Sequence, residues 1–135
     1  MKGSDSTASL FTEVGQALKS RLQRSISLPF SQYQTLWFVA EHTSPSMQDV
    51  ARHFNIRAPS ATFLVEELVQ GGYLERHANA KDRRRVELTL TPKGKRAFKT
   101  FEAKRDAALS KLFGPLGDKD RTELNRILRK MLKRA

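Results

Sequence analysis

The chain has 135 residues, a length that suits one compact domain, and its hydrophobic fraction of 39% is enough to form a core. It carries 25 Lys and Arg against 14 Asp and Glu, and the resulting net charge of +11 favours polyanionic partners. The absence of cysteine excludes disulfides, thiolate nucleophiles, cysteine-ligated zinc and cysteine redox sensing. The longest apolar run, Leu36–Ala40, is far shorter than the roughly twenty residues of a membrane-spanning helix.

The positive charge is concentrated in the second part of the chain. Residues 1–56 carry five Lys or Arg and four Asp or Glu, whereas residues 57–135 carry twenty and ten. Such clustering indicates a polyanion-binding surface more strongly than the total charge does. The first residues also lack the apolar core of a signal peptide, so we expect a cytoplasmic protein that does not associate with membranes.

Helical periodicity dominates the first part of the chain. After a flexible N-terminus at residues 1–7, the recurrence of apolar residues every three or four positions predicts a helix from Ala8 to Ile26. A capping box formed by Ser31 and Gln34 then predicts a short, buried helix up to about residue 42. Within that helix, we expect the side chains of Tyr33 and Trp37 to lie in the core, and the alternative is that either lines a pocket for a small molecule.

Two further helices and a hairpin follow. Ser46 and Asp49 predict the capped start of a helix that ends near Phe54, and a second helix over Pro59–Gln70 ends at a glycine pair. The period then changes to two, as expected for strands. The strands are expected at Tyr73–Arg76 and Val86–Leu90, joined by a polar loop at residues 79–84.

Two amphipathic helices complete the chain. Thr91 is expected to cap the first of them, with Pro92 at its first position, and Gly114 ends it. Asp118 is expected to cap the last helix, whose final turn is basic through Arg129, Lys130, Lys133 and Arg134. The order of elements predicts a mainly α (α+β) fold: a winged helix-turn-helix with a β-hairpin wing.

The pair of helices around the turn at residues 55–57 suits duplex DNA. A helix that enters the major groove needs small or hydrogen-bonding side chains on its exposed face. Pro59, Ser60, Thr62 and Phe63 provide such a face, and Arg57 precedes it in a position to contact a phosphate. The alternative is an ordinary helical hairpin of a core, and Glu66 and Glu67 favour it slightly because acids repel phosphates.

The predicted hairpin carries a cluster of cations at its tip. An arginine there can enter a minor groove, where the negative potential attracts guanidinium groups. We expect Asp82 to hold Arg84 in a bidentate pair that stabilises the wing. The alternative is a solvated charge run that only keeps the hairpin soluble. The candidate DNA-contacting cations are Lys81, Arg83, Arg84 and Arg85.

The sequence resembles the MarR family of bacterial transcriptional regulators over about residues 10–132. The resemblance implies a homodimer with one recognition helix and one wing per subunit, in which Pro59, Ser60, Thr62 and Phe63 enter the major groove. This sequence departs from the family at Phe63, where many members carry a polar or basic residue. It also has no cysteine for peroxide sensing. The matching segments are Leu28–Leu36, Asp49–Ala51, Ser60–Leu68, Gly72–Arg76, Asp82–Arg84 and Leu90–Gly94.

The predicted organisation is a single MarR-like domain at residues 8–135. Residues 31–91 would form the winged helix, and residues 8–27 and 92–134 the dimerisation helices. Apolar stripes on these flanking helices exceed what a winged helix needs to cover, and two-fold packing of two copies would bury them. The alternative is that they only cap their own domain. The family also implies a small-molecule effector pocket between the winged helix and the dimerisation helices.

Other functions have weaker support in the sequence. His42, His53 and His77 lack the spacing of metal ligands, and neither a glycine-rich phosphate loop nor a Ser-His-Asp arrangement is recognisable. We therefore expect no enzyme activity, cofactor or metal. The predicted function is a sequence-specific regulator, of the repressor type, that binds double-stranded DNA as a homodimer. The alternative is a winged-helix module that binds protein or RNA.

Overall fold

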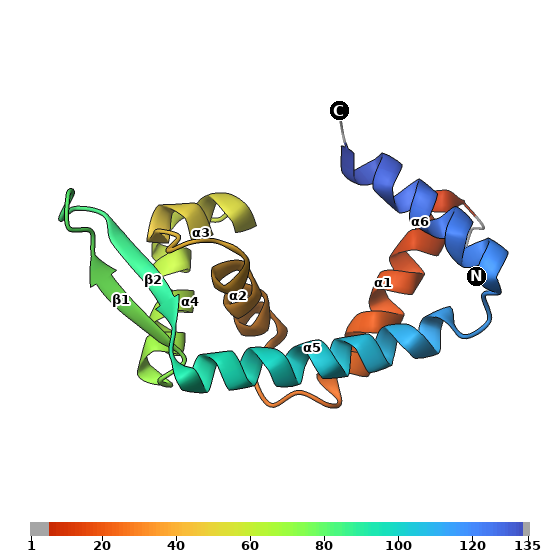
Figure 1. Cartoon of the computed structure of the whole chain (residues 1–135), viewed down its shortest axis with the longest axis horizontal. Coiled ribbons are helices and arrows are strands. Elements are labelled where there is room, and N and C mark those ends of the chain that lie inside the picture. Colours follow the sequence, from red (N-terminus) through yellow and green to blue (C-terminus); the bar gives the residue numbers. More distant parts are fainter. Residues whose placement is uncertain (1–5, 134–135) are drawn as a thin grey trace. The chain divides into compact units, whose positions relative to one another are not determined.

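The computed structural model describes residues 6–133, so the predictions for residues 1–5 and for Arg134 lie outside the described residues. This described part of the chain is mainly helical with one antiparallel hairpin, which confirms the predicted fold class (Figure 1). None of the helices in this described part is both long and apolar enough to cross a membrane. The elements are α1 (Thr7–Gln23), α2 (Phe30–Glu41), α3 (Met47–Phe54), α4 (Ala58–Gln70), β1 (Leu74–Ala78), β2 (Val86–Leu90), α5 (Pro92–Phe113) and α6 (Asp118–Lys133).

The chain divides into two compact units. One is Ser25–Lys104, which holds α2 to β2 and the first part of α5, and the other combines the segments before and after it. The core of the first unit is drawn from each of its helices and from both strands. Its fully buried apolar side chains include Leu36, Val50, Val65, Leu68 and Leu88.

The start of α2 differs from the prediction. Pro29, not Ser31, occupies the N-cap, and its carbonyl accepts the backbone N–H groups of Gln32 and Tyr33. The extended backbone of Pro29 ends the preceding loop, so the helix begins two residues early and the predicted capping box does not form. Trp37 is also misplaced by the prediction, because 43% of it is exposed. Tyr33, in contrast, is buried and stacks on Phe101 with 4.8 Å between ring centroids.

The predicted cap of α3 is confirmed as a reciprocal capping box. The Ser46 hydroxyl accepts the backbone N–H of Asp49 at 3.1 Å, and the Asp49 carboxylate accepts the backbone N–H of Ser46 at 2.9 Å. This satisfies two backbone donors that a helix start otherwise leaves unpaired. Ser46 is 2% exposed, so the serine side of the box is shielded from competing water.

The hairpin is anchored along its second strand. β1 and β2 pair in antiparallel register, with Arg76 opposite Leu88. On its other edge, β2 meets the segment before α3: Ser46 and Glu87 form an isolated antiparallel bridge, and the Leu88 N–H donates to the Pro45 carbonyl at 2.8 Å. The start of α3 and the hairpin therefore share backbone hydrogen bonds.

The flanking helices follow the prediction with small shifts. α1 ends at Gln23 instead of Ile26. The prediction overran the helix because the apolar pattern continues into the following loop, where Ile26 is half-buried. Thr91 caps α5 as predicted, since its hydroxyl accepts the Gly94 N–H at 2.9 Å. Asp118 is the first residue of α6 rather than its cap, and the Gly117 carbonyl accepts the Arg121 N–H.

We expect the Ser46→Ala variant to lower the free energy of unfolding by about 1–2 kcal/mol, because the N-cap hydrogen bond is lost. Ser31→Ala is the matched control: this exposed serine lies inside α2, so its loss is expected to change stability by less than about 0.5 kcal/mol. Chemical denaturation followed by circular dichroism measures both. Equal effects of the two substitutions would contradict the assigned capping roles.

Candidate nucleic-acid interface

α3, a short turn and α4 form the predicted helix-turn-helix. Asn55 adopts a left-handed backbone conformation (φ 52°) and ends α3, and the Ile56 N–H donates to the Ala51 carbonyl. Asparagine tolerates this conformation better than most residues. Arg57 is the N-cap of α4, and no side chain caps the N–H groups of the first turn. These groups are therefore available to an acceptor from outside the chain.

One face of α4 is buried and the other is exposed. Ala61, Val65 and Leu68 pack into the core. The residues that the sequence predicts for the major groove are all on the exposed side, and Phe63 is exposed to 67%. They are Pro59, Ser60, Thr62 and Phe63, preceded by the exposed Arg57.

The two acidic residues of α4 are engaged within the chain. Glu66 forms an ion pair with Arg76 of β1, and the Glu67 carboxylate accepts a hydrogen bond from the Gln32 side-chain amide at 2.8 Å. Arg76 compensates the charge of Glu66, which weakens the argument against a phosphate partner. The hydrogen bond of Gln32 also links the first turn of α2 to α4.

The wing tip, residues 79–84, is built by side chains that fold back on the backbone. The Asn79 side-chain oxygen accepts the N–H groups of Lys81 and Asp82 at 2.8 and 2.9 Å. The Asp82 carboxylate accepts the Arg84 N–H at 3.1 Å. Such turns hold the loop without using the cationic side chains, and Lys81, Arg83 and Arg84 are exposed.

The predicted bidentate pair between Asp82 and Arg84 is wrong. Only Nε of Arg84 approaches the Asp82 carboxylate, at 3.9 Å, and the Arg84 side chain is 97% exposed. The carboxylate instead accepts a hydrogen bond from the backbone N–H of Arg84 within the turn. The sequence reasoning also missed Asn79, although an asparagine at the start of a polar loop is a usual signal for such a turn.

Arg85 differs from the other cations of the cluster. Its Nη2 atom lies 3.1 Å from the Asp49 carboxylate of α3, and its Nε atom lies 3.9 Å from the Glu87 carboxylate. The sequence separation of 36 residues between Arg85 and Asp49 hides this pair from any local pattern.

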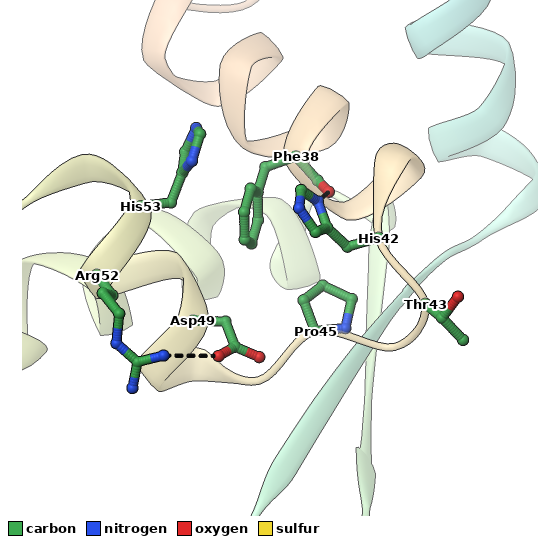
Figure 2. A pocket seen from close by; sticks show the side chains of 7 residues that line it. All are labelled: Phe38, His42, Thr43, Pro45, Asp49, Arg52 and His53. Atoms are coloured by element: carbon green, nitrogen blue, oxygen red, sulfur yellow. Dashed lines mark hydrogen bonds and ion pairs between the residues drawn. The ribbon is translucent and has the colours of Figure 1, made fainter. Parts of the chain in front are cut away.

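Asp49 has the most strongly shaped electrostatic environment of this region. The hydrogen bond from the Ser46 backbone N–H holds the pKa of the Asp49 carboxyl below its usual value, with further contributions from the Ser46 hydroxyl, Arg85 and Arg52. Figure 2 shows Asp49 at the wall of a hollow beside α3, with the ion pair to Arg52. The N–O distance of that pair is 3.4 Å.

The three histidines lie outside α4, at the end of α2, in α3 and in β1. His42 and His53 flank the ring of Phe38, with centroid distances of 4.2 and 4.4 Å (Figure 2). His77 contacts the hydroxyl of Thr89 at 3.0 Å on the hairpin. Among residues 6–133, His, Asp and Glu side chains do not gather into a cluster of three that would suit a metal ion.

The fold and these contacts define a winged helix-turn-helix protein. Residues 26–85, which span α2 to the wing tip, match the family model described as MarR family. The resemblance stated from the sequence is thereby confirmed.

Curated relatives and solved structures agree with this assignment. The chain is 23% identical to the HTH-type transcriptional repressor MdtR of Bacillus subtilis, over 96% of this chain and 83% of MdtR. It is 28% identical to the HTH-type transcriptional regulator BilQ of Clostridium symbiosum, over 84% of this chain and 78% of BilQ. Both are named as regulators of transcription, which agrees with the expectation that the chain is not an enzyme.

Two solved structures share the fold over nearly the whole chain. A crystal structure of MarR has a TM-score of 0.83 at 16% identity and covers 99% of this chain and 93% of MarR. The S. aureus MepR–DNA complex has a TM-score of 0.80 at 20% identity, over 98% of this chain and 100% of MepR.

The lowered pKa of Asp49 predicts a pH dependence of stability. A carboxylate whose pKa is lower in the folded than in the unfolded state stabilises the fold above its ordinary value of 3.8, and this contribution is lost as the pH falls through the lowered value. We therefore expect the difference in free energy of unfolding between the wild type and Asp49→Asn to shrink below pH 3.8. Urea denaturation at a series of pH values measures it, and a difference that stays constant down to about pH 2 would contradict the assignment.

Proposed function

We propose that the chain is a sequence-specific regulator of transcription that binds double-stranded DNA as a homodimer, of the repressor type. The observation that carries the proposal is the combination, in one compact unit, of an uncapped and exposed start of α4 with a hairpin whose tip cations Lys81, Arg83 and Arg84 are exposed. The names of MdtR as a repressor and of MepR in complex with DNA support it.

The proposed contacts divide between positioning and base recognition. The first turns of α4 would enter the major groove, with Ser60 and Thr62 as hydrogen-bonding residues and Phe63 against a thymine methyl group. Arg57 and the free N–H groups of the first turn would bind phosphates. The exposed tip residues Lys81, Arg83 and Arg84 would follow the adjacent minor groove, on a turn that Asp82 and Asn79 hold in shape.

The flanking helices are the proposed dimerisation elements. α1 exposes Leu10, Phe11 and Val14 on neighbouring turns, and α6 exposes Ile127, Met131 and Leu132, while Leu124 and Leu128 are only half-buried. An apolar surface of this kind is costly on an isolated chain, and an isologous interface would cover it. Two copies would then meet a pseudo-palindromic operator whose half-sites lie about 34–36 Å apart.

Regulation by a small molecule and a cytoplasmic location complete the proposal. Two proteins of the same fold support the former: a solved PcaV structure contains its natural ligand, and 6-hydroxynicotinic acid regulates DNA binding by BpsR. Residues 31–91 would carry DNA binding, and residues 8–27 and 92–134 would carry dimerisation, within one MarR-like domain at residues 8–135.

We expect Arg84→Ala to weaken binding to a duplex selected from a random pool by about 1–3 kcal/mol and to reduce the slope of log affinity against log salt by about one. Arg129→Ala, which removes an exposed arginine from α6, is the control and is expected to leave both quantities unchanged. Fluorescence anisotropy at several salt concentrations measures them. A wild-type chain whose affinity for duplex DNA hardly depends on salt would favour the alternative of a protein-binding module.

For the dimer, we expect Phe11→Glu and Met131→Glu each to shift the chain from dimer to monomer, because a charge cannot be buried in an apolar interface without a partner. Gln16→Glu introduces the same charge on the opposite side of α1 and is expected to leave the dimer intact. Sedimentation equilibrium reports the mass. A wild-type chain that sediments as a monomer would remove the dimer from the proposal.

A further inference from the structure

Arg85 is the one cation of the hairpin cluster that lies between two carboxylates of its own chain. The Asp49 carboxylate is 3.1 Å from its Nη2 atom and the Glu87 carboxylate 3.9 Å from its Nε atom, and 40% of its side chain is exposed. Arg84, its neighbour, is 97% exposed. Two adjacent arginines therefore have different environments, and a difference in function follows from them.

The partner of Arg85 is itself fixed. The Asp49 oxygen that faces Arg85 also accepts the Ser46 backbone N–H at 2.9 Å, and its other oxygen faces Arg52. Asp49 lies in the first turn of α3, the helix that packs against α4. The guanidinium of Arg85 is thus bonded to α3, which packs against α4, whereas the backbone of Arg85 belongs to the hairpin.

The position of Arg85 along the hairpin gives this tie mechanical importance. Backbone bonds to Pro45 and Ser46 fix β2 at Glu87 and Leu88. Among the residues of the hairpin that the structure describes, Arg85 is the one nearest the tip whose side chain bonds to α3. Its backbone also closes the turn, because its N–H donates to the Asp82 carbonyl and its carbonyl accepts the Asn79 N–H. A two-stranded hairpin that projects from its anchor is free to bend unless such a bond restrains it.

We propose that Arg85 is a positioning residue, which through Asp49 sets the direction of the wing tip relative to α3 and α4 and leaves DNA contact to its neighbours. The inference rests on the proposed DNA-binding function for its consequence, but its geometric part concerns the free protein. It assigns the charge of Arg85 to an internal bond, so that Lys81, Arg83 and Arg84 meet phosphates at a fixed distance from α4.

The geometric part is tested in the free protein. Because the chain has no cysteine, spin labels can be placed at Gln48→Cys in α3 and Ala80→Cys at the tip, both exposed, without first replacing a native cysteine. Dilution with unlabelled chain suppresses distances between subunits. We expect a narrow distance distribution that Arg85→Gln broadens, whereas Arg83→Gln, the matched loss of an exposed arginine, leaves it unchanged. An unchanged distribution in Arg85→Gln would overturn the proposal.

The functional part is tested by a double-mutant cycle on the selected duplex. Asp49→Asn keeps an oxygen for the capping box but removes the charge. We expect Arg85→Gln to weaken binding about three- to fivefold in the wild type, as for a partly exposed ion pair, and to have no further effect in Asp49→Asn. A loss of equal size in both backgrounds would mean that Arg85 contacts DNA directly.

The two parts separate failure of the inference from failure of the proposed function. If the wild type binds no duplex while Arg85→Gln still broadens the distances, the positioning role stands and the DNA-binding function falls. Thermal unfolding of Arg85→Gln within a few degrees of the wild type shows that the variant is folded, and Arg85→Lys, which restores a cation, is expected to recover part of the narrow distribution.

Discussion

The carboxylate of Asp49 joins the parts of the winged helix. It closes the capping box of α3, it faces Arg52 on its own helix, and it binds Arg85 at the root of the wing tip. A carboxylate near the positive end of a helix is stabilised there in any case, and each of these donors adds to that preference. The start of the first helix of the pair and the hairpin thus depend on one charged group, whose loss would affect both.

A second constraint is electrostatic. A surface that binds a polyanion must keep its cations unpaired and compensate its acids, because each uncompensated carboxylate opposes the attraction. Two acids of the chain have cationic partners, since Glu66 pairs with Arg76 and Asp49 with two arginines, while the Glu67 carboxylate accepts a hydrogen bond from the neutral amide of Gln32. Each ion pair removes one cation together with one acid, so the net charge of +11 is carried by the remaining cations.

Much of this arrangement follows from local patterns in the sequence. The capping box at Ser46, the cap at Thr91 and the alternation of β2 were all predictable, because each depends on residues within a few positions of one another. The start of α2 was not, since the backbone of Pro29 provides the N-cap there in place of the predicted Ser31 side chain. The exposure of Trp37 was not predictable either: its apolar neighbours in the sequence indicate burial, but its position around the helix leaves 43% of it exposed. The pair of Arg85 and Asp49 depends on how the hairpin meets α3, which no local pattern encodes.

The junction between the hairpin and α5 is unusually tight. The Thr91 hydroxyl bonds the Gly72 carbonyl at 2.5 Å, and at Gly94 even a single added carbon would collide with the Tyr73 carbonyl. Because the backbone segments around Gly72–Tyr73 and Thr91–Gly94 are held so closely, this junction leaves no room for one segment to rotate against the other. A tilt of the first turns of α5 must therefore move both strands of the hairpin with it. The start of α5 and the hairpin are rigidly coupled rather than flexibly connected.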